Sequence, residues 1–343
     1  MKLSDKLRTL PVLGIITLMT IPVQHGCESL HLEGSGFTGA VTVPVKVAVH
    51  GKEAAQEKEM DMLVFRNDRL QCLECWQRVP FSGSGDVAVA SMAGEKVLMA
   101  CCGLDSTPED WMWVSSISSL NDAWSALEKE NGDSPVMSGS CLFNAGIPMG
   151  KRPELVLRRI SGEIYLRSLK CDFTGRAYEG EALSEVSVYL TNVNASCRIW
   201  GGPGSAARIV NQGRLIEEDI ARFTDQSIIY QRIEGEVGAA GIMPGIRLRC
   251  YPNMAEEEGP GSPFTRLVIQ GCLDGEVWYW PIDINREEGH SPEGVEGNCI
   301  YTYDIVLTRK GSADPDTAIK TGSATIRMEV DKWEEKEEYY VAF

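Results

Sequence analysis

The sequence predicts a mainly β protein built from two β-sandwich domains with a few short helices. Short runs of alternating apolar and polar residues recur along the chain, which is the pattern of half-buried strands. An Asp274-Gly275 pair separates two such runs and predicts a hairpin, because both turn residues take positive φ. The length of 343 residues is more comfortable as two domains than as one.

The strongest predicted strand is the run AVTVPVKVAV at residues 40–49. It places five valines on one face: Val41, Val43, Val45, Val47 and Val49. Pro44 lies on the opposite face and has no backbone N–H to donate to a ladder. The sequence therefore predicts an edge strand with one strongly apolar face.

Further strands are expected wherever apolar alternation recurs between turn residues. A glycine-rich change of texture after Trp200 predicts the boundary between an N-terminal sandwich at 27–199 and a C-terminal sandwich at 200–343. Two helices are expected, at 118–132 with Ser118 or Ser119 as its cap, and at 214–223. The other expected strands cover residues 59–65, 95–102, 154–166, 183–193, 245–252, 265–284, 298–312 and 323–330.

The chain ends on EEYYVAF, which also has the alternation of a strand. Tyr339, Val341 and Phe343 share one face, and Tyr340 and Ala342 share the other. Terminal residues usually fray unless something holds them, so an apolar strand at the last residue needs a sheet to join. Two interpretations stay open: the strand pairs within its own domain, or it pairs with another molecule.

The first 26 residues have the pattern of a secretory signal peptide. Three basic residues precede an apolar run from Leu10 to Val23, and this run is too short to span a bilayer comfortably. Gly26-Cys27 closes the segment as in a bacterial lipobox, which predicts Cys27 as the lipidated first residue of the mature protein. Gln24 departs from the leucine usual at that place. The alternative is ordinary cleavage nearby, which leaves Cys27 a plain thiol.

The charge of the chain excludes some classes of partner. With 49 acidic against 33 basic residues, the formal net charge is −16. Such a balance opposes binding to nucleic acid and attraction to anionic lipid. The ten cysteines other than Cys27 lie mostly in apolar stretches, and buried thiols are expected rather than disulfides.

The sequence predicts no enzyme, no metal site and no cofactor site. The loop at 145–152 lacks the first glycine and the Ser or Thr of a phosphate-binding loop. Adjacent glutamates such as Glu217-Glu218 are typical of solvated surface rather than of paired catalytic carboxylates. None of the three histidines of the mature chain stands in a metal-ligand spacing: His31, His50 and His290.

An alternative function is that of a surface carbohydrate-binding lipoprotein. Trp278, Tyr279 and Trp280 could form a sugar-stacking platform on an exposed face. In an alternating strand, however, the two tryptophans share one face and the tyrosine takes the other, which favours core packing with one half-exposed ring.

In the order of its segments the chain resembles the fimbrillins of Bacteroidales bacteria, the subunits of type V pili. Each segment alone is loose, and the order is the specific part. The segments run from Gly26-Cys27 and the valine strand through EKVLMACCGLDS, SSLNDAWSAL, SPVMSGS, LRRISGEIYL, VSVYLTNV, CYPN, VWYWPIDI and CIYTYDIVLTRKGSADPDT to MEVDKWEEKEEYYVAF.

The resemblance implies two transthyretin-like sandwiches and a lipoprotein exposed at the outer membrane. It implies polymerisation with other fimbrial subunits into a fimbria that supports adhesion, with surface ligands on host or bacterial cells as further partners. Assembly would proceed by strand exchange. The valine strand at 41–49 occupies a groove until it is removed, and Tyr339, Val341 and Phe343 of a neighbour then fill that groove.

One departure from the resemblance concerns the position of the subunit in the fibre. Stalk subunits of this kind are cut after an arginine in the loop that follows their first strand. This chain has only Lys52 and Lys58 there. A subunit that keeps its first strand and its lipid would be an anchor, whereas a protease that accepts lysine would make it a stalk subunit.

Overall fold

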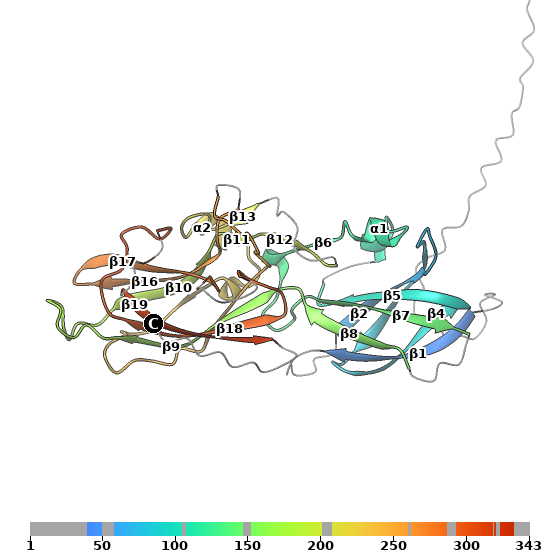
Figure 1. Cartoon of the computed structure of the whole chain (residues 1–343), viewed down its shortest axis with the longest axis horizontal. Coiled ribbons are helices and arrows are strands. Elements are labelled where there is room, and N and C mark those ends of the chain that lie inside the picture. The colour runs from blue at the N-terminus through green and yellow to red at the C-terminus, as the bar shows by residue number, and fades with distance from the viewer. Residues whose placement is uncertain are drawn as a thin grey trace, which may run out of the picture.

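The computed structural model describes residues 40–49, 58–104, 108–146, 152–200, 208–259, 262–286, 293–317, 319 and 323–332. These residues form a mainly β protein with two β-sandwich units side by side along the long axis of the molecule (Figure 1). Across the described ranges, no helix is both long enough and apolar enough to cross a membrane.

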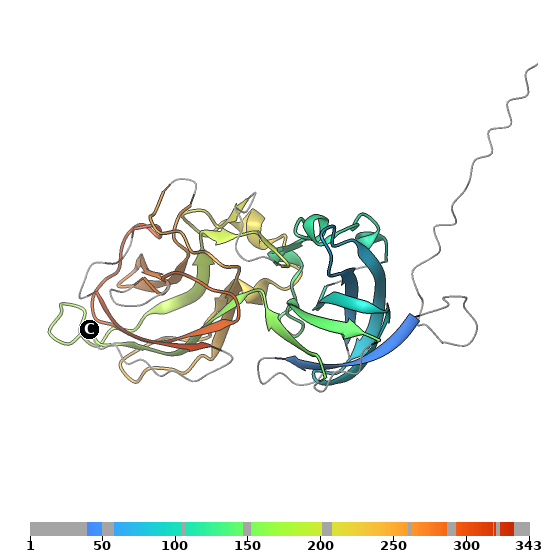
Figure 2. The ribbon, with the colours of Figure 1, turned by 45° about the vertical axis from the view of Figure 1, so that its right-hand side comes forward.

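The N-terminal unit is one sheet that turns back on itself. Its strands are β1 (Ala40–Val49), β2 (Lys58–Arg66), β3 (Leu73–Phe81), β4 (Gly85–Met92), β5 (Gly94–Cys102), β7 (Met137–Ala145) and β8 (Glu154–Arg159). Their order is β3-β2-β5-β7-β8-β1-β4. Strands β7 and β8 pair only through Met137 and Ser138, so the sheet bends there into two layers around one core (Figure 2).

The layer formed by β3, β2, β5 and β7 is apolar on both faces. Its inner face contributes buried side chains such as Met62 and Leu98 to the core between the layers. Its outer face carries Leu63, Phe65 and Met99, which are covered by the segment between β5 and β7. Strands buried on both faces read as continuous apolar runs, which is why β2 and β5 were readily predicted.

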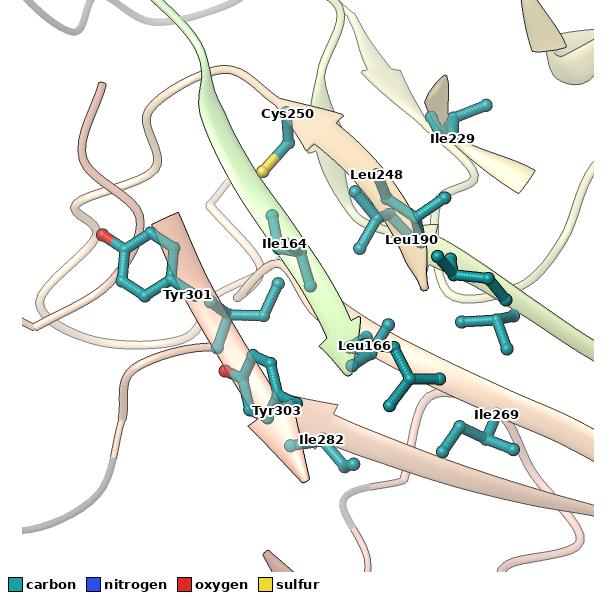
Figure 3. Close-up of a cluster of buried hydrophobic side chains, with 14 of the residues drawn as sticks. Ile164, Leu166, Leu190, Ile229, Leu248, Cys250, Ile269, Ile282, Tyr301 and Tyr303 are labelled. Atoms are coloured by element: carbon teal, nitrogen blue, oxygen red, sulfur yellow. The ribbon is translucent and has the colours of Figure 1, made fainter. Parts of the chain in front are cut away.

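The C-terminal unit packs two four-stranded sheets face to face, in the orders β14-β10-β16-β17 and β15-β9-β18-β19. Side chains from both sheets meet in its core, among them Leu166, Ile269 and Tyr303 (Figure 3). The strands are β9 (Gly162–Cys171), β10 (Ser184–Thr191), β14 (Tyr230–Arg232), β15 (Ile246–Cys250), β16 (Arg266–Leu273), β17 (Glu276–Asp283), β18 (Cys299–Leu307) and β19 (Ala324–Lys332).

The predicted domain boundary after residue 199 is wrong for the described strands. Both β9 and β10 precede that point, yet β9 pairs with β15 and β18, and β10 pairs with β14 and β16. The sheets divide between Arg159, which ends β8, and Gly162, which begins β9. The glycine-rich texture after Trp200 therefore does not mark the division between the sheets.

A segment that we call the strap, Trp124–Lys129, belongs to the N-terminal half of the chain but pairs with a strand close to the C-terminal unit. In it, β6 (Trp124–Ala126) pairs with β12 (Ser196–Arg198), and a 3₁₀ turn follows at Leu127–Lys129. Beside it, β11 (Val193–Asn194) pairs with β13 (Ile209–Val210). The side chain of Glu128 in the strap accepts a hydrogen bond of 2.6 Å from Arg208. The two units are therefore joined by more than the chain between β8 and β9.

The long helix predicted at 118–132 is wrong beyond its first turn. Helix α1 spans only Ile117–Leu120, and Ser116 caps it through a capping box with Ser119. The rest of the segment is the strap, whose pairing with β12 overrides its helical periodicity. The second predicted helix is confirmed as the single turn α2 (Glu217–Ile220).

The Asp274-Gly275 hairpin is confirmed. Asp274 has φ 56° and Gly275 has φ 77°, and the ladder between β16 and β17 closes at Leu273 and Glu276. Positive φ at both turn residues gives the twist that matches the flanking strands.

Candidate functional site

The candidate site is the place of β1 in the N-terminal unit. Val45 and Val47 are fully buried there, and the other three valines of the strand are half-buried. All five belong to the core between the two layers: Val41, Val43, Val45, Val47 and Val49. The predicted apolar face of this strand is thus an inner wall of the sandwich.

The valines face an apolar trough built by the other strands. Its floor includes Met62 of β2 and Leu98 of β5, and its sides include Val89 of β4 and Leu157 of β8, all with no exposed surface. If β1 were removed, these side chains would form an apolar groove open to water. Only another strand with an apolar face could both cover the side chains and satisfy the backbones beside them.

The backbone of β1 is paired on both sides over part of its length. It is antiparallel to β4 from Ala40 to Val47. It is parallel to β8 from Lys46 to Val49, where the Lys46 N–H donates to the carbonyl of Pro153 at 3.0 Å. The Lys46 Nζ also lies 2.8 Å from Glu154 Oε1. The ladder between β1 and β8 is therefore short and lies at the C-terminal end of β1.

The edge position predicted from Pro44 holds for only half of β1. Among the described strands, pairing with β8 begins at Lys46, so the backbone at Pro44 has a strand partner on the β4 side alone. From Lys46 onward β1 lies inside the sheet between β8 and β4. A residue without an N–H is tolerated on the open side, as expected.

Strand β4, which forms one wall of the trough, also makes contacts with β3 that do not involve β1. In β3, the Gln77 side chain donates to the carbonyl of Ala90 at 2.9 Å and accepts from the Ala90 N–H at 3.2 Å. This side chain replaces a backbone ladder between β3 and β4. Strand β4 therefore has a contact with β3 that does not depend on β1.

A carboxylate at the end of β3 strengthens the same contact. Glu74 accepts hydrogen bonds from Lys96 Nζ at 2.5 Å, from the Met92 N–H at 2.6 Å and from Ser91 Oγ at 2.9 Å. Burial alone would raise the pKa of Glu74, but these three donors outweigh it and lower the pKa below its ordinary value. The ionised form therefore ties β4 and β5 to β3.

The opposite wall, β8, rests directly on β7. A Cβ at Gly139 of β7 would lie 2.1 Å from the carbonyl oxygen of Val156, which is closer than any real contact. Glycine is required there because the two backbones approach each other so closely. Both walls of the trough are thus fixed by contacts that do not involve β1.

Comparisons with known proteins agree on this architecture. No family model and no curated protein sequence matches the chain. Among solved structures, a fimbrillin from Porphyromonas gingivalis has a TM-score of 0.62 at 11% identity and covers 86% of this chain and 99% of its own. The chain has the fimbrillin fold.

Two further structures share the fimbrillin fold with this chain. A candidate cell adhesion protein from Parabacteroides distasonis has a TM-score of 0.62 at 13% identity and covers 87% of this chain and 98% of its own. The tip fimbrial protein Mfa3 from Porphyromonas gingivalis, with a C-terminal truncation, has a TM-score of 0.52 at 10% identity and covers 86% and 99%. At these identities the likeness is one of fold.

Several residues with a predicted role in lipidation, cleavage or strand donation lie outside the described ranges. They are Cys27, Lys52 and the three residues of the closing strand, Tyr339, Val341 and Phe343. Lys58 is the first residue of β2, and its backbone pairs with Phe81 of β3. The structure therefore places one of the two candidate cleavage lysines in a ladder.

Candidate metal-binding and catalytic residue types are scattered over the described residues. Within the described residues, no three His, Cys, Asp or Glu side chains are grouped as for a metal ion, and none of the ten cysteines there forms a disulfide. The three histidines considered above lie outside those ranges. Of the glutamate run at 256–258, Glu258 is bound to the buried Arg266 at 2.6 Å.

One carboxyl group is strongly perturbed, and it lies where the strap meets the C-terminal unit. Glu130 is 2% exposed, and burial raises its pKa to about 7. Ser161 Oγ donates to it at 3.4 Å, and the positive charge of Arg249 acts in the opposite direction to burial. Perturbed carboxyls often mark active sites. Here the group is enclosed in the junction and contributes to how the two units pack.

The aromatic residues at 278–280 do not form an exposed platform. Trp280 has no exposed surface, and its Nε1 donates to the carbonyl of Arg309 at 3.1 Å. Trp278 is half-buried against the core, and Lys310 Nζ lies 5.2 Å from its ring centroid. The favoured interpretation of these residues, core packing with one half-exposed ring, agrees with their positions.

Proposed function

We propose that this chain is a structural subunit of a type V fimbria that supports cell adhesion and assembles by strand exchange. In this proposal a neighbour's C-terminal strand takes the place of β1. The single observation that carries the proposal is that β1 fills an apolar trough whose two walls are each fixed without it. The fimbrillin fold of the chain supports the same function.

The energetics of β1 set what a replacement strand must supply. Two fully buried valines contribute about 3–6 kcal/mol, at about 1.5–3 kcal/mol each. A donated strand would have to match this burial and restore the ladders to β4 and β8. Tyr339, Val341 and Phe343 stand at the same two-residue spacing as the valines and carry larger apolar side chains on average.

The proposal places the subunit at the bacterial outer membrane. The signal-like segment at 1–26 would direct export, and lipidation of Cys27 would attach the precursor to the membrane. The partners would be other fimbrial subunits, of the same or a different kind. The acidic charge of the chain opposes binding to nucleic acid.

Release of β1 would require a cut between β1 and β2. Lys52 is the better candidate of the two lysines, because Lys58 already belongs to the β2 ladder and proteases need an unpaired extended segment. N-terminal sequencing of the subunit from isolated fibres separates the two positions. A start at residue 53 assigns a stalk subunit, and a retained Cys27 assigns an anchor.

A pair of neighbouring substitutions tests strand exchange. Val341→Asp puts a charge on the face that would enter the trough, whereas Ala342→Asp puts the same charge on the opposite face. We expect Val341→Asp to abolish fibres in negative-stain electron microscopy and Ala342→Asp to retain them. Fibres of normal length and number with Val341→Asp would refute the proposal.

A further inference from the structure

Three of the four edge strands in the described sheets of the C-terminal unit are protected. The Gln231 side chain of β14 donates to the carbonyl of Arg247 in β15 at 3.0 Å, which joins these two edges. The edge strand β17 carries Pro281, and its Tyr279 exchanges backbone hydrogen bonds of 2.9 and 2.7 Å with Ser312. Open edges invite pairing with other chains, and short strands, proline and covering loops are common ways to block it.

Strand β19 (Ala324–Lys332) is the fourth edge, and within the described residues it has none of these protections. It pairs with β18 along all nine of its residues without a bulge. Its sequence holds no proline and no glycine. No described strand pairs with its outer side. Strand β19 therefore presents a long and regular edge with which another strand can pair.

The side chains of β19 alternate between an apolar face and a polar face. Met328 is 2% exposed in the core, and Ile326 and Val330 are half-buried beside it at the rim. The opposite face carries four polar side chains: Thr325, Arg327, Glu329 and Asp331. About Met328 as a centre, apolar residues stand at mirrored positions on one face, and opposite charges stand at mirrored positions on the other.

We propose that β19 pairs with β19 of a second copy of this chain, antiparallel and centred on Met328. In this register Arg327 of each copy lies opposite Glu329 of the other, and Ile326 lies opposite Val330. Opposite charges directly across a ladder stabilise it, whereas like charges weaken it. The two sheets that end in β19 then form one continuous sheet, with both cores on the same side.

The charges of β19 disfavour the neighbouring registers. Alternate residues face the core, so only registers that oppose residues of the same face keep both cores covered. Centring on Arg327 would put two arginines opposite each other, and centring on Glu329 would do the same with two glutamates. Of these three registers, only the one centred on Met328 pairs every residue of the strand and opposes no like charges.

Contacts within each chain hold the glutamate of this pair in place. Glu329 accepts hydrogen bonds of 3.1 Å from Arg167 of β9, and Arg167 is also paired with Asp304 of β18. Arg327 Nη2 lies 3.1 Å from Glu329 Oε1, and the Arg327 side chain is 43% exposed. Pairing of two copies would extend this row of alternating charges across the two-fold axis.

The proposed contact is closed by its symmetry. Both copies use the same edge, so a pair is complete and adds no third copy through β19. The contact uses a different strand from the trough of β1, so it goes beyond strand exchange and does not depend on it. In a fibre it would join two fibres side by side rather than lengthen either of them.

Analytical ultracentrifugation of the subunit that retains β1 tests the pairing, because its trough is already filled. A contact between two edge strands is smaller than a standard interface and binds weakly. We expect a reversible dimer within a concentration series of about 1–100 µM. A subunit that stays monomeric throughout the series would overturn the proposal, and this is the result expected if the chain's own closing strand covers β19.

Charge reversal provides matched variants. Arg327→Glu opposes two carboxylates at both places where an attractive pair stood, and should weaken the dimer about tenfold. Glu329→Arg should have a similar effect through two opposed arginines. A mixture of these two variants has opposite charges at both places again and should dimerise. Arg232→Glu, at an exposed arginine of β14, makes the same change in net charge as Arg327→Glu and should leave the dimer unchanged. Equal effects of Arg327→Glu and Arg232→Glu would contradict pairing through β19.

Disulfide trapping tests the register with milder substitutions. In the proposed register Thr325 lies opposite Asp331 of the second copy, and Cα atoms about 4.5–5.5 Å apart suit a disulfide. Thr325→Cys and Asp331→Cys subunits are mixed under mild oxidation, and joined peptides are identified by mass spectrometry. We expect a disulfide between positions 325 and 331, and none between two copies of either position, since these lie about 20 Å apart. A mixture without the bond between 325 and 331 would refute the register.

The two proposals fail in different ways. If strand exchange is wrong, Val341→Asp leaves fibres intact, while the disulfide between positions 325 and 331 still forms. If β19 pairing is wrong, this disulfide is missing although Val341→Asp still abolishes fibres.

Discussion

Truncation of one valine of β1 should loosen the strand by an amount that its burial sets. Val47 has no exposed surface, so Val47→Ala removes two buried carbon groups at about 0.8 kcal/mol each and leaves a cavity in addition. The expected loss is about 2–3 kcal/mol. Val43 is half-buried, and Val43→Ala should cost about 1 kcal/mol.

Native-state hydrogen exchange of peptides from residues 40–49 measures this loss as a local opening free energy, which avoids the assumption that both units unfold together. Exchange should be about 30-fold to 150-fold faster for Val47→Ala, since 1.4 kcal/mol corresponds to tenfold. Thr42→Ala changes the exposed face of the same strand and should alter exchange by less than about threefold. Equal acceleration in Val47→Ala and Thr42→Ala would refute the assignment of β1 as the plug of the trough.

Three other perturbations test the surroundings of the trough and the junction. The lowered pKa of Glu74 means that its contribution to stability is present above its unfolded pKa of about 4.5 and is lost as the pH falls below that value. Glu74→Gln should therefore remove this acid dependence from the hydrogen exchange of β4 peptides. An unchanged pH profile in the variant would contradict the role of Glu74. The raised pKa of Glu130 has the opposite effect on stability. The free energy of unfolding should fall by on the order of 3 kcal/mol as the pH rises from about 4.5 to about 7. Glu130→Gln should remove this pH dependence in thermal melts, and a dependence that persists in the variant would point to another group. Gly139→Ala should push β7 and β8 apart and destabilise the N-terminal unit by more than about 2 kcal/mol, whereas a neutral result in urea titration would contradict the close approach to Val156.

The sequence was most informative where one physical requirement determines the residue type. The five valines needed a common apolar face, and Asp274-Gly275 needed positive φ, so both were read correctly. Strand β3 was not predicted, because polar side chains make structural contacts on both of its faces and the apolar–polar alternation is lost. On one side Gln77 replaces a ladder to β4, and on the other Trp76 and Arg78 both donate to the buried Asp61.

The domain boundary and the strap could not be predicted from local patterns. The sheet that contains β9 is completed by β18, more than 130 residues away in the chain, and nothing in residues 162–171 identifies that partner. The strap has the periodicity of a helix, but its backbone pairs with β12. Long-range pairing of this kind overrides local propensity. The closing strand presents the same difficulty in stronger form, because its proposed partner is another molecule.

The strap that joins the two units has a mechanical consequence for any fibre built from this chain. Tension that enters one sandwich can pass to the other through β6 and β12 as well as through the covalent link behind β8, and the ion pair between Glu128 and Arg208 adds a lateral tie. Each subunit would then behave as a stiff rod. Bending of the filament would be concentrated at the joints between successive rods, where under the proposed strand exchange a single strand would bear the load.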